Sequence, residues 1–272
     1  MKLKIEKKRL QELLDKVYPI VPVKSTMPVL SSILIEAKDG NIYLSATDLE
    51  CSITTKGEAE IVEEGAVALS GKELYGIVKE LPDSNIGIEV SELATTIKCG
   101  KGRYNLPGIA KDEFPQLLAV SGGIKANLPL EVLKRGIDKT LFAASTTDPS
   151  SALRNCLLDL HKNECRLVAT DGHKLAIFKS KIKMEQTAQL LISPKVWKEL
   201  SNFNSGVEIA FDESKIKFSD DDTVLVSRLQ EGGFPPYESV IPTDNDKELI
   251  VAKEELFATI SSLSLSVGIT DS

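Results

Sequence analysis

The chain has 272 residues, of which 42% are hydrophobic and 27% charged, a composition typical of a globular protein with about two domains. Its net charge of −7 argues against nucleic-acid binding over the whole surface, but it leaves room for a basic strip on one face. The sequence contains no run of about 18 apolar residues, and its charged start lacks the apolar stretch of a signal peptide. We therefore expect a cytoplasmic protein.

Cysteine and histidine usage argues against a metal centre. The four cysteines form no CxxC pair and lie in or beside apolar runs, so we predict that they are buried and reduced. The chain has two histidines, too few to suggest a zinc site or a histidine-based nucleophile system. We predict neither a metal nor a cofactor. The four cysteines are Cys51, Cys99, Cys156 and Cys165.

The first third of the chain predicts a helix followed by strands and then the same order again. Apolar residues at helical spacing come first, at Leu10, Leu13, Leu14 and Val17. Asp39-Gly40 is a hairpin turn signal between two strand patterns. The expected strands are 32–37, 41–46, 51–55, 58–62, 86–90, 95–99 and 102–106, with a second helix through Leu74 and Val78 that ends at Pro82. Helices packed on antiparallel sheet make this an α+β fold.

A long internal repeat organises the whole sequence. Ala46-Thr47-Asp48 recurs as Ala169-Thr170-Asp171, and helix positions Leu10, Leu133 and Leu256 have the same spacing of 123 residues. This period is the size of a domain and is far longer than a solenoid repeat of about 20–50 residues. We predict domains at 1–122 and 123–245, followed at 246–272 by the start of an incomplete third domain.

Catalytic chemistry finds little support in the sequence. Nucleotide-binding, hydrolase and metalloprotease motifs are absent, and His173 has no partner at nucleophile spacing, so we predict no catalytic residues. Asp48 and Asp171 each follow a strand in a Thr-Asp pair, which is typical of a turn. Together with the aspartates at 220–222 they leave open a metal-dependent hydrolase as a less favoured alternative.

Several strings resemble the bacterial sliding clamp family, the beta subunit of DNA polymerase III. They are Met27-Pro28-Val29-Leu30, Ser45 to Glu50, Arg166 to Leu175, and Gly233-Phe234-Pro235-Pro236-Tyr237. The resemblance runs from residue 1 to about 262. It implies three like domains per chain and two chains per ring, with helices lining a hole through which duplex DNA passes without sequence readout. Such a protein is a non-catalytic processivity factor of the replicative polymerase.

The resemblance also implies three sets of site residues. Basic residues expected near DNA are Lys24, Lys72, Lys134, Arg135, Lys139, Lys195 and Lys198. A groove for short partner peptides maps to Leu153, Thr170, Gly172, His173, Lys174, Leu175, Pro235, Ser239 and Val240. Lys101 and Arg103 lie on the edge expected at the ring interface. The implied partners are duplex DNA, DNA polymerase III subunits with their 3′–5′ exonuclease complex, the clamp loader and repair proteins, and a second copy in a homodimer.

The chain departs from the family pattern in three places. Ser151 and Ala152 stand where the family often has tyrosines, Ser239 replaces a groove arginine, and the pattern fades after Ser262. Because the third domain is expected to be incomplete here, an alternative function is that of a clamp-derived fragment. Such a fragment would bind partner peptides or clamp chains without encircling DNA.

Overall fold

The computed structural model describes residues 1–120, 122–148, 151–183, 187–203 and 206–266. The chain forms two units, Met1–Phe234 and Pro235–Ser272, and each is described here by itself. Within the first unit, two successive sets of elements have the same order of helices and strands. We call them repeat one and repeat two.

Repeat one contains the predicted helices and strands. Its elements are β1 (Lys2–Glu6), α1 (Lys7–Val17), η1 (Tyr18–Ile20), η2 (Pro28–Ser31), β2 (Ser32–Lys38), β3 (Asn41–Thr47), β4 (Cys51–Glu58), β5 (Glu60–Glu63), β6 (Gly65–Ser70), α2 (Gly71–Glu80), β7 (Asn85–Ser91), β8 (Ala94–Cys99), β9 (Gly102–Ile109) and η3 (Lys111–Glu113). The 3₁₀ segments are marked η. Each predicted strand overlaps an observed one, and most bounds differ by only one to three residues.

Repeat two follows the same order, except that β5 has no counterpart among the described residues of repeat two. Its elements are β10 (Ile124–Leu128), α3 (Leu130–Thr140), η4 (Leu141–Ala143), α4 (Ser151–Arg154), β11 (Cys156–His161), β12 (Glu164–Thr170), β13 (Leu175–Lys181), β14 (Ala188–Ile192), α5 (Pro194–Leu200), β15 (Val207–Phe211), β16 (Lys215–Ser219) and β17 (Thr223–Arg228). Helices α1 and α3 begin at residues 7 and 130, and α2 and α5 at 71 and 194, so both pairs are 123 positions apart. The predicted repeat is confirmed, while the domain boundaries at 122 and 245 stay a prediction.

Local sequence explains where the helices begin and end. The buried residues of α1 are Leu10, Leu13, Leu14 and Val17, the apolar face that the spacing predicts. The Ser70 hydroxyl accepts a hydrogen bond from the Glu73 N–H at 3.4 Å and so caps α2. Ser193 caps α5 in the same way through the Lys195 N–H at 3.2 Å. These caps satisfy N–H groups that the helices themselves cannot pair.

The strands of both repeats join into one long sheet. Within the described residues, thirteen strands are hydrogen-bonded in the order β10-β15-β16-β17-β4-β3-β2-β6-β9-β8-β7-β1-β5, and four more form the sheet β13-β12-β11-β14. The two repeats meet where β17 pairs antiparallel with β4, from Thr223 opposite Thr55 to Ser227 opposite Cys51. This pairing makes the β-sheet continuous from one repeat to the next.

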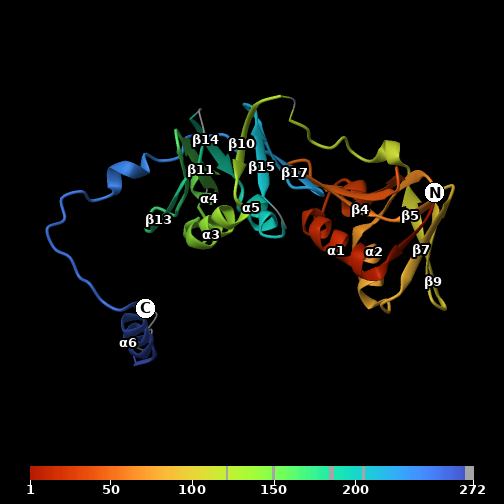
Figure 1. Ribbon diagram of the computed structural model, residues 1–272, viewed down its shortest axis with the longest axis horizontal. Helices are drawn as coiled ribbons and strands as arrows, with labels where there is room; N and C mark the ends of the chain where they lie inside the picture. Colours follow the sequence, from red (N-terminus) through yellow and green to blue (C-terminus); the bar gives the residue numbers. More distant parts are fainter. Residues whose placement is uncertain (121, 149–150, 184–186, 204–205, 267–272) are drawn as a thin grey trace. The chain divides into compact units, whose positions relative to one another are not determined.

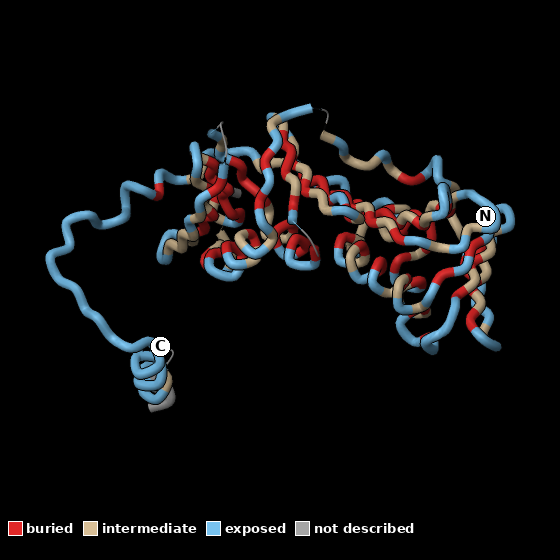
Figure 2. The backbone as a smooth tube through the Cα atoms, in the orientation of Figure 1, coloured by how far each residue is buried: buried red, intermediate tan, exposed pale blue. Residues whose placement is uncertain are grey.

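Buried residues lie on the strands and on the helices packed against them (Figure 2), and their apolar side chains form the hydrophobic core. In repeat two, Trp197 of α5 packs edge-on against Phe218 of β16, with ring centroids 5.9 Å apart, and both are almost fully buried. Burying side chains of this kind stabilises the fold by about 1.5–3 kcal/mol each. All four cysteines are buried and free, as predicted. Burial raises the pKa of the Cys51 thiol to about 12.

A matched turn confirms the repeat at atomic detail. In repeat one the Asp48 carboxylate accepts hydrogen bonds from the N–H groups of Glu50 and Cys51 at 3.1 and 2.7 Å. In repeat two Asp171 accepts from His173 and Lys174, both at 2.9 Å. We call these the Asp48 turn and the Asp171 turn. The left-handed position is Leu49 (φ 75°) in the first and Gly172 (φ 88°) in the second.

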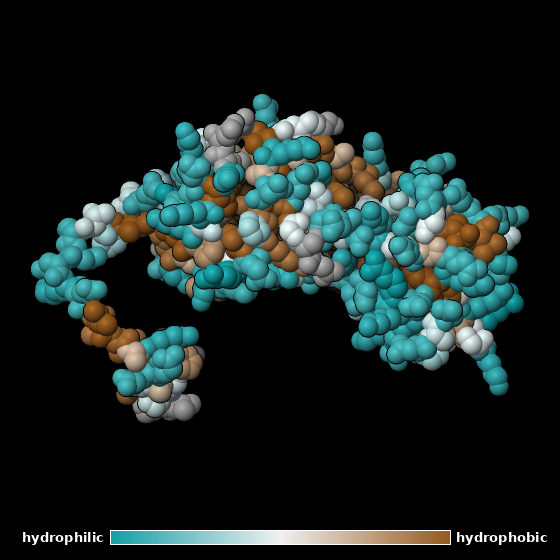
Figure 3. All heavy atoms as spheres, viewed as in Figure 1, coloured by the Kyte–Doolittle hydropathy of each residue, from teal (hydrophilic) through white to brown (hydrophobic). Residues whose placement is uncertain are grey.

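The second unit, taken by itself, holds η5 (Tyr237–Val240) and α6 (Lys253–Ser266). Helix α6 begins 123 positions after α3, at the place where the sequence predicts the first helix of a third domain. The third domain stays a prediction. Apolar side chains gather where the chain enters α6, at Leu249 and Ile250, which are 83% and 87% exposed (Figure 3). None of the helices in the described part of the chain has both the length and the apolar composition needed to cross a bilayer.

The two glycines Gly172 and Gly76 should respond to alanine in opposite ways. We expect Gly172→Ala to lower the free energy of unfolding by about 1 kcal/mol, because an L residue is strained at positive φ. Gly76 lies inside α2, and a Cβ there would meet nothing within 4 Å. Gly76→Ala should therefore raise stability by about 0.5–1 kcal/mol. Urea unfolding measures both, and a stabilising Gly172→Ala would contradict the turn geometry.

Candidate functional site

Four helices of the first unit gather on one side of its sheets (Figure 1). We call their solvent-facing surface the helix face. Helices α1, α2, α3 and α5 together carry 11 basic and seven acidic residues. The whole chain has 33 basic and 40 acidic residues, so the rest of it has 22 and 33. The helices are thus net positive in an acidic protein, and this local excess of cations suits a polyanion.

Five of the predicted DNA-contacting residues have free cationic ends. Lys72 on α2, Arg135 and Lys139 on α3, and Lys198 on α5 are exposed, and none of them forms an ion pair with another described residue. Lys24 is also exposed, in the segment between η1 and η2, and is likewise unpaired within the described ranges. These side chains can reach a ligand without first breaking an internal salt bridge.

Lys134 lies in a groove between the repeats. The groove has a volume of about 490 Å³ and is lined by residues of α1, by Lys134 and by residues 201–203. The Lys134 ammonium donates to the Phe203 carbonyl at 3.2 Å, and Lys16 of α1 donates to the Thr223 hydroxyl at 3.1 Å. Both ammonium groups keep protons for a further acceptor, because a lysine has three donors.

Lys195 is the exception among the predicted DNA contacts. Its ammonium donates to the Asp48 carboxylate at 2.6 Å and to the Ile20 carbonyl at 3.2 Å, both in repeat one. Its neighbour Glu199 on α5 is buried, and this burial raises the pKa of that carboxyl above its usual range. The structure therefore places Lys195 at the junction of the two repeats, where its charge is already matched.

Most predicted groove residues lie around the Asp171 turn of the first unit. Thr170 ends β12, where its hydroxyl donates to the Lys174 carbonyl at 2.8 Å, and Gly172, His173 and Lys174 are exposed. Leu175 begins β13 and Leu153 lies on α4, both half-buried. The Lys174 ammonium pairs with Asp171 and holds the pKa of that carboxyl well below its usual range. Hydrogen bonds from Thr170 and Asp171 hold the backbone of this turn in place.

The other groove residues belong to the second unit. Pro235, Ser239 and Val240 are exposed there, and the Ser239 hydroxyl donates to the Pro236 carbonyl at 2.7 Å. Among the other residues that depart from the family pattern, Ala152 is buried in α4. The side chain of Ser151 lies outside the described residues. The assignment of all these residues to one groove stays a prediction.

The predicted ring-interface residues lie at one end of β9. Lys101 is exposed in the turn before β9, and Arg103 is exposed on the strand opposite Lys98 of β8. On its other side, β9 pairs with β6 only through Gly108 and Ile109. Among the described residues, the first part of β9 therefore has no strand partner on this side and forms an open sheet edge.

The aspartates of the hydrolase alternative are used in turns. Asp48 and Asp171 fix the two matched turns, and Asp220 accepts from the N–H groups of Asp222 and Thr223 at 3.0 and 2.6 Å. The described part of the chain contains no group of three or more His, Cys, Asp or Glu side chains placed to hold a metal ion. The geometry favours the turn interpretation, because Asp48, Asp171 and Asp220 each accept backbone N–H groups of their own turn.

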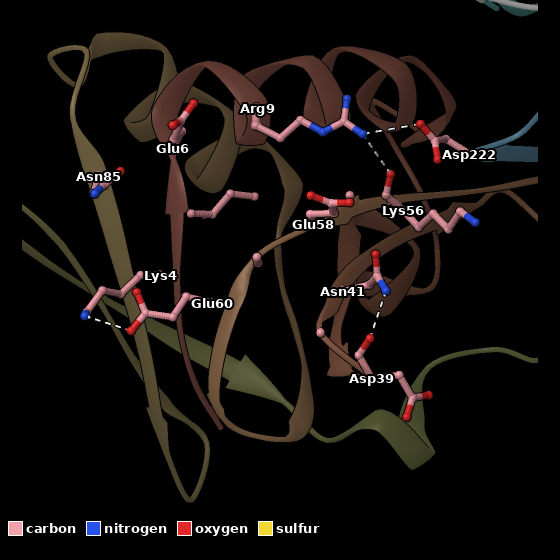
Figure 4. A pocket seen from close by; sticks show the side chains of 14 residues that line it. Lys4, Glu6, Arg9, Asp39, Asn41, Lys56, Glu58, Glu60, Asn85 and Asp222 are labelled. Carbon is pink, nitrogen blue, oxygen red and sulfur yellow. Dashed lines mark hydrogen bonds and ion pairs between the residues drawn. The ribbon is translucent and has the colours of Figure 1, made fainter.

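A second hollow lies near the start of α1 (Figure 4). The sequence predicted no binding or catalytic role for most of the residues that line it. Its volume is about 1000 Å³ and its lining mixes acidic and basic side chains. Arg9 reaches from α1 to Asp222 of repeat two at 3.3 Å, and Lys4 pairs with Glu60 at 3.0 Å. The sequence pattern could not reveal Arg9, Lys16 or Arg228 as contacts between repeats, since each looks like an ordinary charged surface residue.

Comparison with known families agrees with this architecture. A family model of the DNA polymerase III beta subunit, N-terminal domain, matches residues 1–118, and a model of its central domain matches residues 127–236. The beta sliding clamp of Bacillus subtilis (strain 168) is 31% identical over 280 residues, which cover 97% of this chain and 74% of the relative. The beta sliding clamp of Chlamydia pneumoniae is 29% identical over 272 residues, with the same coverage of 97% and 74%.

Solved structures give the same result. The DNA polymerase sliding clamp from Bacillus subtilis has a TM-score of 0.94 and 30% identity, covering 100% of this chain and 75% of that one. A sliding clamp from Pseudomonas aeruginosa bound to griselimycin has a TM-score of 0.92 and 28% identity, covering 97% and 74%. With two family models over most of its length and the repeated fold that they share, this chain belongs to the DNA polymerase III beta subunit family, the DNA sliding clamps of replication.

Proposed function

We propose that this chain works as a sliding clamp by holding duplex DNA against its helix face, and that it performs no catalysis of its own. The observation that carries the proposal is the charge difference between the helices, with 11 basic and seven acidic residues, and the acidic remainder of the chain. DNA would be attracted to the helix face and repelled elsewhere. Its proposed contacts are Lys24, Lys72, Lys134, Arg135, Lys139 and Lys198.

Binding of this kind is independent of base sequence. The proposed contacts are lysine and arginine side chains, five on helices and Lys24 on the segment between η1 and η2. Such side chains suit phosphate groups better than base edges. Phosphate contacts position a duplex without reading it, and their strength falls steeply with salt. A clamp that must move along DNA requires such contacts, because specific base contacts would hold it at one site.

We propose that partner proteins dock short peptides beside the Asp171 turn. The exposed backbone and side chains of Gly172, His173 and Lys174 there adjoin the half-buried Leu175. An apolar floor with a few fixed polar groups is typical of a peptide site. Relatives from Pseudomonas aeruginosa and Bartonella birtlesii bind griselimycin, which supports a ligand site in this family. The proposed partners are DNA polymerase III subunits, the clamp loader and repair proteins in the cytoplasm.

A closed ring would use the free part of β9. Strand β17, which follows β16 as β9 follows β8, already joins repeat two to β4 of repeat one. We propose that β9, with Lys101 and Arg103, meets a strand of a second clamp chain in a homodimer. The positive charge of these two residues calls for acidic side chains on the partner strand.

Removing two cations from α3 should change how DNA binding depends on salt. If Arg135 and Lys139 each contact a phosphate, Arg135→Gln with Lys139→Gln should lower the slope of log affinity against log salt concentration by about 1.8. Fluorescence anisotropy of a labelled duplex at several KCl concentrations measures this slope.

The control for this experiment is Lys162→Gln, in the turn between β11 and β12 and away from the helices. It should leave the slope unchanged. A change of about 0.9 in the control, half that of the double variant, would show that net charge, and not the helix face, governs binding. A separate measurement addresses the clamp-derived fragment. If the chain binds a partner peptide but is not retained on closed circular DNA, the result supports a fragment that binds partners without encircling DNA.

An acidic residue at Val240, which the sequence resemblance assigns to the peptide groove, tests that assignment. Val240 is 69% exposed, so Val240→Asp should leave the fold intact while placing a charge against the apolar anchors of a peptide. We expect affinity for a peptide with leucine and phenylalanine anchors to fall about tenfold or more. Val62→Asp on β5, where valine is 57% exposed, is the matched control. Unchanged affinity in Val240→Asp would remove Val240 from the groove.

A further inference from the structure

Lys195 occupies a position that the family resemblance assigns to DNA contact, yet its ammonium is directed into the protein. It donates to Asp48 at 2.6 Å and to the Ile20 carbonyl at 3.2 Å, which lie on two different elements of repeat one. We infer that Lys195 is a positioning residue: it locks α5 of repeat two against repeat one and thereby aligns the cations that contact DNA. This inference rests on the proposed function of the helix face.

The acceptor of this lysine is built to be rigid. One oxygen of Asp48 accepts the N–H groups of Glu50 and Cys51, which leaves the other oxygen for Lys195. The two side chains are 20% and 37% exposed, so water only partly screens their attraction. The hydrogen bonds to its own turn restrict the movement of the Asp48 carboxylate. The ion pair with Lys195 therefore restrains the distance between α5 of repeat two and the Asp48 turn of repeat one.

The Asp48 turn also forms hydrogen bonds with Arg228, at the end of strand β17 of repeat two. The Arg228 side chain donates to the Leu49 carbonyl at 3.2 Å, and the Arg228 N–H donates to the Glu50 carbonyl at 2.9 Å. These contacts continue the pairing of β17 with β4. The Asp48 turn thus contacts both α5 and β17 of repeat two, and Lys195 makes the contact from α5.

The repeat itself provides a comparison within one molecule. Lys72 stands 123 positions before Lys195 and lies at the same place on α2, but it is exposed and has no ion-pair partner among the described residues. Asp171 stands 123 positions after Asp48, and its carboxylate pairs with Lys174 of the same turn. In the described part of the chain, the lysine and the aspartate meet only where one repeat joins the other. Their pairing therefore reflects the junction and not the local sequence.

The consequence for DNA concerns the neighbouring cation on the same helix. Lys198 follows Lys195 by about one turn of α5 and is exposed. If α5 loses its attachment to Asp48, Lys198 moves relative to the cations of repeat one. A duplex binds best when several phosphates are contacted at once, so misalignment weakens binding even though no DNA contact has been removed.

The test uses Lys195→Met, Asp48→Asn and the double variant in the full chain. Asparagine keeps the oxygen that closes the turn and removes only the charge. Both single variants should speed amide hydrogen exchange in β4 and β17 and weaken binding of a short duplex by a similar factor, about three to ten. The double variant should be no worse than either single one. Lys195→Arg should retain most of the affinity, because it can still pair with Asp48.

If Lys195 contacted a DNA phosphate directly, Asp48→Asn should change DNA affinity in the opposite direction. Asp48→Asn removes a negative charge and frees Lys195, so it would strengthen DNA binding if Lys195 were a phosphate contact. Lys195→Met would then lower the salt slope by about 0.9 and leave exchange in β4 and β17 unchanged. That pair of results would overturn the inference.

The repeat-related residues are the controls. Lys72→Met should lower the salt slope without changing exchange at the junction, and Asp171→Asn should leave exchange in β4 and β17 at the wild-type rate. If the unaltered chain binds no duplex, the proposed DNA face fails, while exchange in Lys195→Met and Asp48→Asn still decides whether the pair locks the junction. Unchanged exchange in both variants refutes the lock.

Discussion

The pairing of β4 with β17 is the constraint on which the rest of the first unit depends. A row of backbone hydrogen bonds turns the strands of two repeats into one continuous sheet, and the buried hydroxyls of Thr55 and Thr223 lie 3.2 Å apart within it. Because neighbouring strands in a sheet keep a nearly constant twist, this pairing restricts the angle between the repeats. It also brings the helices of both repeats to the same side (Figure 1). A single helix face, and not two unrelated ones, is the result.

The placement of charged residues then determines which ligands the helix face attracts. An acidic protein repels polyanions over most of its surface, and the cations grouped on four helices mark the face on which we propose that a duplex binds. Several basic side chains near the junction, among them Arg9, Lys16 and Lys195, contact the other repeat. Basic residues therefore serve two purposes on this side of the molecule, since some hold the repeats together and others remain free for phosphate.

Periodic features were predictable from the sequence because they depend on neighbours along the chain. Helical spacing at Leu10 to Val17 predicted α1, the Asp39-Gly40 pair predicted the β2–β3 turn, and the Thr-Asp pairs predicted two matched turns. The role of Lys195 was not predictable in this way. Its distinguishing feature is the distance to Asp48, and 147 positions separate these residues in the chain.

The sequence by itself determined the repeat, the α+β class and the family, since all three follow from patterns that recur every 123 residues or from short strings. Only the tertiary structure decided which copy of a repeated residue is free and which is bound. Lys72 and Lys195 share one local pattern, as do Asp48 and Asp171, yet only Lys195 and Asp48 meet. The physical reason is that the repeat places the same residue types at matching positions of both units, whereas the junction exists only after β17 has paired with β4.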